Sequence, residues 1–517
     1  MIEAATKTQL KDIAVRYLLH RNVGVRMLAV AVLALIVGGP IGILVGLLGP
    51  VVGAAAVIAI VAVYAVFRSP LLALLSVMAV AFVLPFAAVP VDIGFAPTFL
   101  DLTLVAAFVV WISRTVLHKD REIILEWPFG GVLVFATLAV FSFIVGLSHA
   151  PLSSTILRRF AELLLAILSF VLVLNIVRTR QQLVIAAHAM VCGGFMAGLA
   201  GVGIYFLPRD LAQRVLNALS ALRYPSGDVL RYIEDDPEQA LRAIGTSVDP
   251  NVLGGVLIFT AVLGTALLLC KEPILPRWLL AVMVGTMVIC LYLTYSRSAF
   301  VGLAVGIALL GVFRYPKLIW WGLAGALLML LLPQTQDYVQ RFIGGLRGED
   351  LAMQMRFGEY KDALIVIRRH PWIGVGFSGT PEIDTYIGVS SVYLLIGEEM
   401  GLIGLTAFVA TMGAFFVRFL ARRHVLAQDS LLQAIGYGTT MAVAGALVAG
   451  LADHYLFNLV FPHAGVILWS TMALGVASLR IAVLPERRIT PDRRHWIVQA
   501  FLPDPPPQRR AADVPTP

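Results

Sequence analysis

Long apolar stretches, separated by short basic connections, run through nearly the whole chain. The hydrocarbon core of a bilayer is about 30 Å thick, so a helix that crosses it needs roughly 20 mainly apolar residues. By this criterion the pattern predicts an all-α fold, a polytopic transmembrane helix bundle of about 14 spans (12–14) with a partly helical outer-face loop. The expected spans lie near residues 27–48, 50–67, 70–88, 98–117, 128–147, 157–177, 183–206, 250–270, 277–295, 298–313, 318–333, 389–417, 430–451 and 455–481.

The composition supports a membrane protein. Of 517 residues, 59% are hydrophobic and only 14% are charged, whereas soluble domains carry about 25% charged residues. The net charge of +8 is typical of basic cytoplasmic loops, so we expect no nucleic-acid partner. The three cysteines lie inside apolar runs and predict no disulfide and no metal site. We expect no cofactor.

The basic residues fix the expected orientation. In membrane proteins, Lys and Arg accumulate in cytoplasmic loops, and a cytoplasmic N-terminus puts almost every short basic connection on one side. We therefore expect both termini in the cytoplasm and two longer loops, near 207–249 and 334–388, on the outer face. The basic residues that support this orientation are Lys7, Lys11, Arg16, Arg21, Arg26, Arg68, Lys119, Arg121, Arg178, Arg180, Lys271, Arg277, Arg314, Lys317, Arg418, Arg422 and Arg423.

Three segments follow from this reading. Residues 1–26 are expected to form a cytoplasmic N-terminal segment, and residues 27–483 the transmembrane domain. Residues 484–517 are rich in proline and charge and end in PDPPPQRRAADVPTP. Such a composition predicts a disordered cytoplasmic tail.

The tight turn Ser296-Arg297-Ser298 joins two apolar spans on the predicted outer side. A charge at this depth is costly unless it is paired, snorkels to the headgroups or faces a hydrated cavity. Arg297 therefore either snorkels or faces an anionic, lipid-linked substrate.

A second arginine, Arg356, opens a segment of the second outer loop. Ala363, Val366 and Ile367 fall at helical spacing, which predicts an amphipathic helix that ends before His370-Pro371. The helix is either a lipid-anchored surface element or part of a binding site. Two arginines on the outer side would suit a diphosphate, because guanidinium groups bind phosphate oxygens bidentately and keep their charge.

Carboxylates open the following span. Ser390-Ser391 begins it, and Glu398, Glu399 and Gly401 follow. Adjacent carboxylates within an apolar span indicate either a lined cavity or a helix-packing pair, in which the glycines allow close approach.

The order of these segments resembles the O-antigen ligase and polysaccharide polymerase superfamily of bacterial inner membranes. The resemblance covers roughly residues 157–480. It implies transfer of a glycan from an undecaprenyl diphosphate carrier to an acceptor hydroxyl on the periplasmic side. It also implies that Arg297 and Arg356 hold the carrier diphosphate. The segments that carry the resemblance are Asp249-Pro250-Asn251, Ser296-Arg297-Ser298, Arg356 through Phe377, and Ser390-Ser391 with Gly401-Leu402-Ile403-Gly404.

One position departs from the family pattern. Ligases carry a histidine where this chain has Ser390, and a hydroxyl cannot accept a proton near neutral pH as imidazole can. The departure favours a polymerase over a ligase. The candidate catalytic residues are Glu399, His454 and Ser390; His370, Glu398 and Asp453 are further candidates for the base.

The sequence thus predicts a metal-independent membrane glycosyltransferase that polymerises a surface or exported polysaccharide from undecaprenyl-diphosphate-linked repeat units. Its partners would be that lipid-linked oligosaccharide, membrane lipids and other polysaccharide assembly or export proteins. An O-antigen ligase is the nearest alternative. A transporter of lipid-linked sugars or a non-catalytic export partner are alternatives of another class. No internal repeat of the kind seen in transporters is evident, and the candidate residues gather at one face.

Overall fold

The computed structural model describes residues 27, 63–89, 94–117, 122–148, 152–331, 336–348, 351–377 and 389–483. Contacts divide the chain into two units, Met1–Arg68 and Ser69–Pro517. In the first unit, residues 63–68 are helical and Arg68 Nε donates a hydrogen bond of 2.8 Å to the Tyr64 hydroxyl. Most of the predicted spans 27–48 and 50–67, and the predicted tail 484–517, lie outside the described residues.

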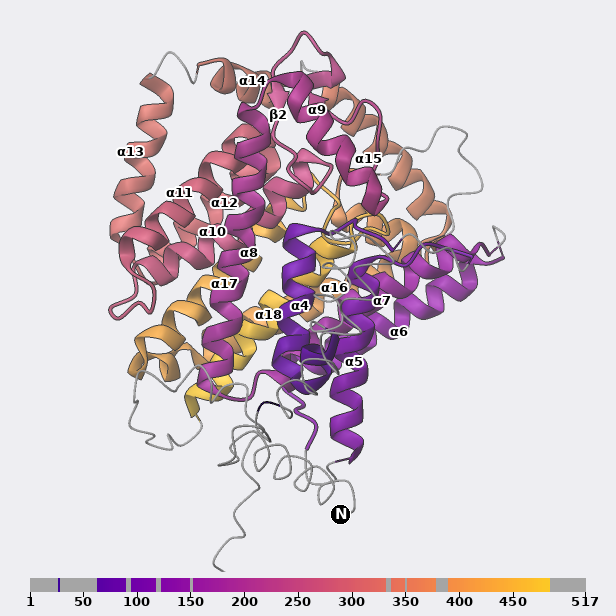
Figure 1. The fold of residues 1–517 in the computed structure, drawn as a ribbon. Helices are drawn as coiled ribbons and strands as arrows, with labels where there is room; N and C mark the ends of the chain where they lie inside the picture. The colour runs from indigo at the N-terminus through magenta and orange to yellow at the C-terminus, as the bar shows by residue number, and fades with distance from the viewer. Residues whose placement is uncertain are drawn as a thin grey trace, which may run out of the picture. The chain divides into compact units, whose positions relative to one another are not determined.

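The second unit consists almost entirely of helices (Figure 1). Among the residues described, eight helices are long and apolar enough to cross a bilayer, and four apolar helices are shorter. The all-helical, multi-pass architecture is confirmed, whereas the number of about 14 spans stays a prediction. The eight are α5 (Phe99–Leu117), α6 (Pro128–Gly146), α7 (Ser154–Ile176), α8 (Arg180–Phe206), α10 (Pro250–Leu268), α16 (Val392–Arg422), α17 (Ser430–Ala449) and α18 (Pro462–Val483); the four are α4 (Pro70–Val83), α11 (Arg277–Leu293), α12 (Arg297–Phe313) and α13 (Lys317–Leu331).

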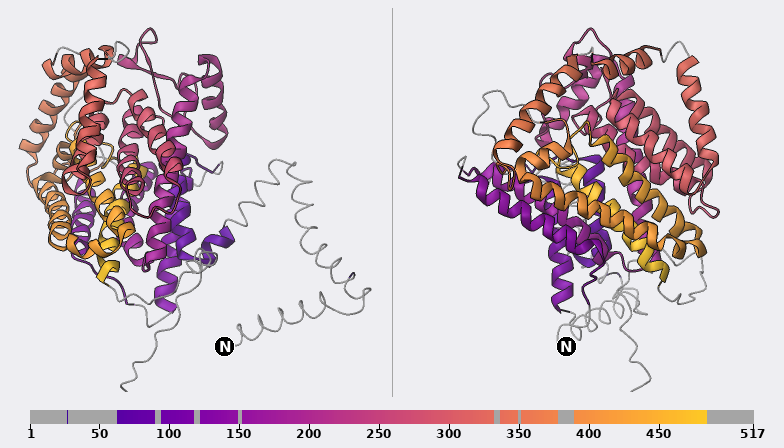
Figure 2. Two further views of the ribbon diagram at one scale, coloured as in Figure 1. Left: turned by 90° about the vertical axis from the view of Figure 1, so that its left-hand side faces the viewer. Right: turned by 180° about the vertical axis from the view of Figure 1, so that it is seen from behind.

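Helices α10, α17 and α18 form the core of this unit. Nearly every residue of each is buried, as expected of helices that are apolar all round. Helix α17 packs against α10 and α12, and α18 packs against α7 and α17. Helix α4 also contacts α18, so elements from opposite ends of the unit lie side by side (Figures 1 and 2).

Side-chain caps start the helices that matter for the site. The Asp249 side chain caps α10 by accepting hydrogen bonds from the backbone N–H groups of Asn251 and Val252, at 2.8 and 3.0 Å. The Ser296 hydroxyl caps α12. Such caps satisfy backbone donors that have no partner inside the helix. The end of the bundle where α10 and α12 begin is called the site end below.

The predicted start of the last span is wrong. Helix α18 begins at Pro462, seven residues after the expected Tyr455, and the apolar residues 455–461 belong to a connection. Proline has a backbone suited to the first position of a helix, and it disfavours helical geometry in the residue before it. The proline therefore sets the boundary, although the hydrophobic run continues through it.

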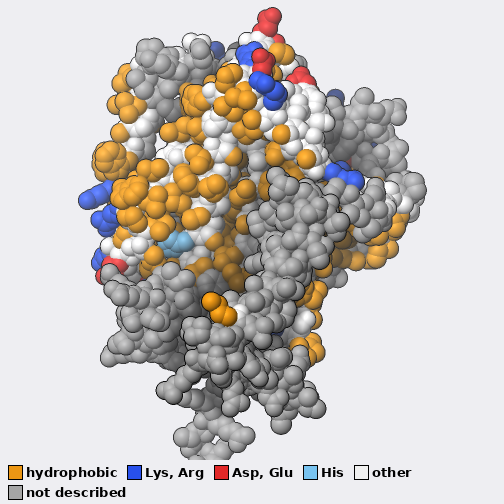
Figure 3. Space-filling view, in the orientation of Figure 1, with side chains coloured by type: hydrophobic (Ala, Val, Ile, Leu, Met, Phe, Trp, Pro, Cys, Tyr) orange, Lys and Arg blue, Asp and Glu red, His pale blue; other side chains and the backbone are white. Residues whose placement is uncertain are grey.

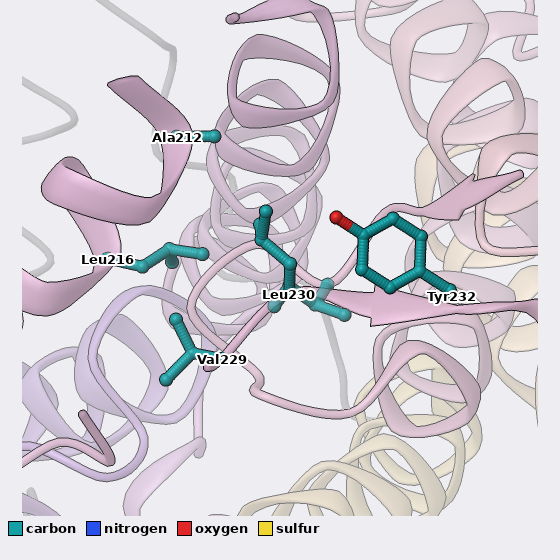
Figure 4. Close-up of a cluster of buried hydrophobic side chains, with 6 residues drawn as sticks. Ala212, Leu216, Val229, Leu230 and Tyr232 are labelled. Carbon is teal, nitrogen blue, oxygen red and sulfur yellow. The ribbon is translucent and has the colours of Figure 1, made fainter. Parts of the chain in front are cut away.

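The first long loop, 207–249, is a small folded element. It contains α9 (Arg209–Ala218), 3-10 helices η1 (Leu219–Leu222) and η2 (Ile233–Asp235), and antiparallel strands β1 (Arg231–Tyr232) and β2 (Leu241–Arg242), in which Arg231 faces Arg242. Figure 3 shows charged side chains near the top of the molecule, where α9 lies, above a broad hydrophobic surface. Figure 4 shows the small core of the loop, which contains Ala212, Leu216, Val229, Leu230, Tyr232 and Ile244.

The second long loop contains two helices, α14 (Gln336–Arg347) and α15 (Leu351–Arg369). Ala363 and Val366 are buried while Phe357, Leu364 and Ile365 are exposed. The helix predicted to end before His370-Pro371 is therefore confirmed, whereas its amphipathic character is not, because several of its exposed side chains are apolar. A further 3-10 helix, η4 (Arg423–Gln428), follows α16.

Candidate functional site

Asp453 is the centre of a polar cluster at the site end. It lies in the connection between α17 and α18 and is only 4% exposed. Ser298 Oγ donates a hydrogen bond of 3.1 Å to Asp453 Oδ2, and the hydroxyls of Ser296 and Ser298 are 3.1 Å apart. The backbone N–H of His454 donates to Asp453 Oδ1 at 3.0 Å. A buried carboxylate is thus joined directly to the serine-arginine-serine turn.

Both predicted arginines belong to segments that reach this carboxylate. Arg297 is the first residue of α12, between two serines that belong to the cluster. Arg356 lies in α15, and its positive charge acts on Asp453. Burial raises the pKa of Asp453, while the charges of His454 and Arg356 oppose this shift. The structure therefore brings the two separate segments that carry these arginines to Asp453.

A third arginine, Arg242 of β2, was not predicted. Its Nε donates to the carbonyl of Thr294 at 2.8 Å, and its Nη2 donates to Asn251 Oδ1 at 2.7 Å. Burial lowers the pKa of Arg242, and the negative charges of Asp249 and Asp453 oppose this change. The available signal was an arginine seven residues before the cap Asp249, in a loop already expected on the outer face.

Ser390 belongs to the same cluster through its backbone. The Ser390 N–H donates to Glu359 Oε2 at 2.9 Å, and its carbonyl accepts a hydrogen bond of 3.1 Å from the Tyr360 hydroxyl. Both partners are on α15. Two residues later, the N–H of Val392 donates to the Asp453 carbonyl at 2.9 Å. The beginning of α16 is thereby tied both to α15 and to the connection that carries Asp453.

Several polar atoms next to this cluster are buried without a hydrogen-bond partner within the described part of the chain. His454 Nδ1 and the Tyr455 hydroxyl belong to the two residues after Asp453, and Thr246 Oγ1 lies three residues before the cap Asp249. His454 Nδ1 lies 3.9 Å from Asp453 Oδ1, which is too long for a hydrogen bond. Buried polar groups normally have partners, so a group of exceptions beside three charged residues indicates a site for a polar ligand.

Glu399 lies in a different part of α16. The helix is interrupted at Gly401, whose φ of +66° favours glycine. At 1.5 Å per residue, Glu399 is roughly 10 Å along the helix from Val392. The carbonyl of Glu399 accepts a hydrogen bond of 2.9 Å from the Gly376 N–H, and another from the Ser142 hydroxyl. The structure gives Glu399 a place at this break, away from the contacts of Asp453 described above.

The segment after α15 fills the break in α16. The Val375 N–H donates to the Glu398 carbonyl at 2.9 Å, and the Leu402 N–H donates to the Pro371 carbonyl at 2.7 Å. A side chain at Gly401 would place a Cβ 2.3 Å from the backbone of Trp372. The glycine in the predicted motif is therefore required for backbone packing. His370 takes part through its carbonyl, which accepts the Gly374 N–H at 3.2 Å.

The cluster combines three arginines, a buried carboxylate and a histidine at one end of an apolar bundle. Guanidinium groups are suited to phosphate oxygens, and an imidazole can accept a proton. The arrangement is chemically suited to bind a phosphate-containing anion and to transfer a proton beside it.

Residues 282–409 match the family model described as O-antigen ligase. The match covers about a quarter of the chain and supports membership of the O-antigen ligase superfamily. The O-antigen ligase segment runs from within α11 to within α16, so it includes Arg297, Arg356, Ser390 and Glu399. Arg242, Asp453 and His454 lie outside it. The match supports a membrane glycan-processing role. No curated protein matches the chain.

Proposed function

We propose that this protein is a membrane glycosyltransferase that polymerises a surface or exported polysaccharide from undecaprenyl-diphosphate-linked repeat units. The reaction would occur on the periplasmic face of a bacterial inner membrane, with both termini in the cytoplasm. The family match supports the class of reaction. The observation that carries the proposal is the convergence of Arg356, Arg242 and Ser298 on buried Asp453, beside unpartnered polar atoms.

Arg297 and Arg356 bind the diphosphate of the carrier in this proposal. An acceptor hydroxyl oxygen attacks the anomeric carbon of the donor sugar, and the bond from that carbon to the diphosphate oxygen breaks. The electron pair of that bond leaves with the carrier diphosphate. The arginines stabilise the charge that develops on the leaving group, which lowers the barrier more than equal binding of the ground state would.

His454 is the proposed general base that takes the proton of the acceptor hydroxyl. It is partly exposed, with 29% of its side chain accessible, and it adjoins Asp453. In a structure without substrate, catalytic hydrogen bonds are often longer than in the reacting complex. Glu399 and Ser390 stay as the other predicted catalytic residues.

Polymerisation is favoured over ligation because Ser390 stands where ligases carry a histidine. A transporter would need access from both sides of the membrane, whereas the charged cluster occupies one end of the bundle. The proposal also keeps the predicted division of the chain into a cytoplasmic N-terminal segment (1–26), a transmembrane domain (27–483) and a cytoplasmic tail (484–517).

The test is reconstitution of the purified protein in liposomes with undecaprenyl-diphosphate-linked oligosaccharide, with chain length followed on a gel. Wild-type protein should give a ladder of products. Arg356→Ala should give little product, while Arg368→Ala should behave as wild type, because Arg368 is exposed on the same helix. A single-step transfer to an added lipid acceptor, without a ladder, would support the ligase instead. Absence of any transfer by wild-type protein would refute the enzyme.

A further inference from the structure

The end of strand β2 is attached to the turn that precedes α12. The Ala243 N–H donates to the Leu293 carbonyl at 2.9 Å, and Arg242 Nε donates to the next carbonyl, that of Thr294, at 2.8 Å. Loop 207–249 therefore contacts the last residues of α11 through two consecutive carbonyls.

The turn held by Arg242 has an unusual backbone. Tyr295 has a φ of +53°, in the left-handed region that non-glycine residues seldom occupy. The Ser296 N–H donates to Thr294 Oγ1 at 3.2 Å, and α12 begins one residue later at Arg297. A conformation of this kind persists only where its surroundings determine it. The hydrogen bond from Arg242 to the Thr294 carbonyl is one of the contacts that hold this conformation.

A second bond of Arg242 reaches the start of α10. Nη2 donates to Asn251 Oδ1 at 2.7 Å, and the Asn251 N–H donates in turn to the cap Asp249. The starts of α10 and α12 are closely packed, since a Cβ on Gly254 would lie 2.8 Å from the Ala299 side chain. One guanidinium thus joins the first turn of α10 to the turn that precedes α12.

We propose that Arg242 is a positioning residue for Arg297, because it fixes the Thr294–Ser296 turn against the start of α10. The inference rests on the proposed function, in which Arg297 binds the carrier diphosphate. The Nε and Nη2 atoms of Arg242 donate hydrogen bonds to Thr294 and Asn251. The effect of Arg242 on the substrate therefore passes through the turn. Lysine cannot reproduce the two-pronged geometry, because its ammonium is a single point of donation.

The test is a double-mutant cycle with Arg242→Gln and Arg297→Lys, read as affinity for undecaprenyl diphosphate and as kcat and KM for polymerisation. The binding measurement remains possible even in variants without activity. Arg242→Gln should weaken binding by at least about tenfold, because a displaced Arg297 would lose charge-assisted hydrogen bonds to the diphosphate. In the Arg297→Lys background it should add less than about twofold, because residues that act through one another are not additive.

Arg231→Gln is the matched control. Arg231 is the cross-strand partner of Arg242 in the same sheet, but it is exposed. The Arg231→Gln variant should bind undecaprenyl diphosphate and polymerise as the wild-type protein does. Arg242→Lys should recover only part of the affinity, and its thermal midpoint in detergent should stay close to that of wild type.

Two outcomes would overturn the inference. Fully additive losses would show that Arg242 acts independently of Arg297, and an equal loss in Arg231→Gln would assign the effect to the sheet as a whole. Failure of the proposed function gives a different result, since wild-type protein would then not bind undecaprenyl diphosphate and Arg297→Lys would change nothing.

Discussion

Ser298 and Asp453 are joined by a hydrogen bond of 3.1 Å although 155 positions separate them in the chain. Ser298 lies inside the segment that matches the O-antigen ligase family, whereas Asp453 lies beyond it. The matched segment therefore carries only part of the polar cluster. The connection between α17 and α18 supplies the carboxylate to which the serine-arginine-serine turn is tied.

Asp453 should make the stability of the protein depend on pH. Burial raises its pKa above the ordinary value of 3.8, so folding favours the protonated form. This contribution is fully present below pH 3.8 and is lost as the pH rises through the raised folded-state pKa. In Asp453→Asn, which keeps an oxygen for Ser298, the thermal midpoint in detergent should fall less over that range. An unchanged pH profile would contradict a buried, titrating Asp453.

Substitution of either proposed diphosphate-binding arginine should strongly reduce glycan transfer while the protein still inserts. Hydrogen bonds to charged groups contribute about 1.5–3 kcal/mol each, and each 1.36 kcal/mol corresponds to about tenfold in rate. We expect Arg297→Ala and Arg356→Ala to lose roughly ten- to a hundredfold or more, with partial recovery in the lysine variants. Product chain length in reconstituted liposomes measures this. Normal ladders in both alanine variants would rule out a diphosphate clamp.

Removal of the proposed base should slow transfer without loss of carrier binding. General-base catalysis contributes typically 10²–10⁴-fold, so His454→Ala should fall by about that factor in kcat. Added imidazole should restore part of the activity, because it can occupy the space of the missing ring. His424→Ala is the control, since His424 is exposed in η4. A fully active His454→Ala would leave Glu399 as the next predicted base to replace.

Ser390→Ala should have a mild effect, less than about tenfold in kcat/KM, because only a hydroxyl is lost. Tyr360→Phe should be more harmful, as it removes the hydroxyl that donates to the carbonyls of Ser390 and Leu451, at 3.1 and 3.2 Å. Both variants are measured in the polymerisation assay. A dead Ser390→Ala whose activity returns in Ser390→His would reverse the conclusion and favour the ligase.

The predicted orientation can be tested by cysteine labelling in intact cells. In a Cys192→Ser background, where Cys270 and Cys290 are buried, Asp236→Cys should react with a membrane-impermeant maleimide. Glu272→Cys, exposed between α10 and α11, should react only after permeabilisation, since the positive-inside rule puts its loop in the cytoplasm. The opposite pattern would invert the topology and remove the proposed site from the periplasm.

Much of the helical architecture could be predicted because bilayer thickness imposes a length on every span. The sequence also allowed the prediction of Arg297 and Arg356 as candidate residues and of the helix before His370, because charges and helical spacing are easily recognised in an otherwise apolar sequence. The role of Arg242 was not, because its partners Thr294 and Asn251 come together only in the tertiary structure. The late start of α18 was missed because hydrophobicity continues through the connection that precedes Pro462.

The hydrogen bonds that hold Ser390 in place are made by its backbone, so they do not depend on which side chain stands at this position. Glu359 and Tyr360 hold its N–H and carbonyl, and neither of these bonds involves the Ser390 hydroxyl. The side chain at position 390 can therefore change while the backbone around it keeps its hydrogen bonds. A hydroxyl could be exchanged for an imidazole here without altering those two bonds. Closely related proteins could then differ in the reaction they perform through one residue, while keeping the same scaffold and the same hold on the carrier.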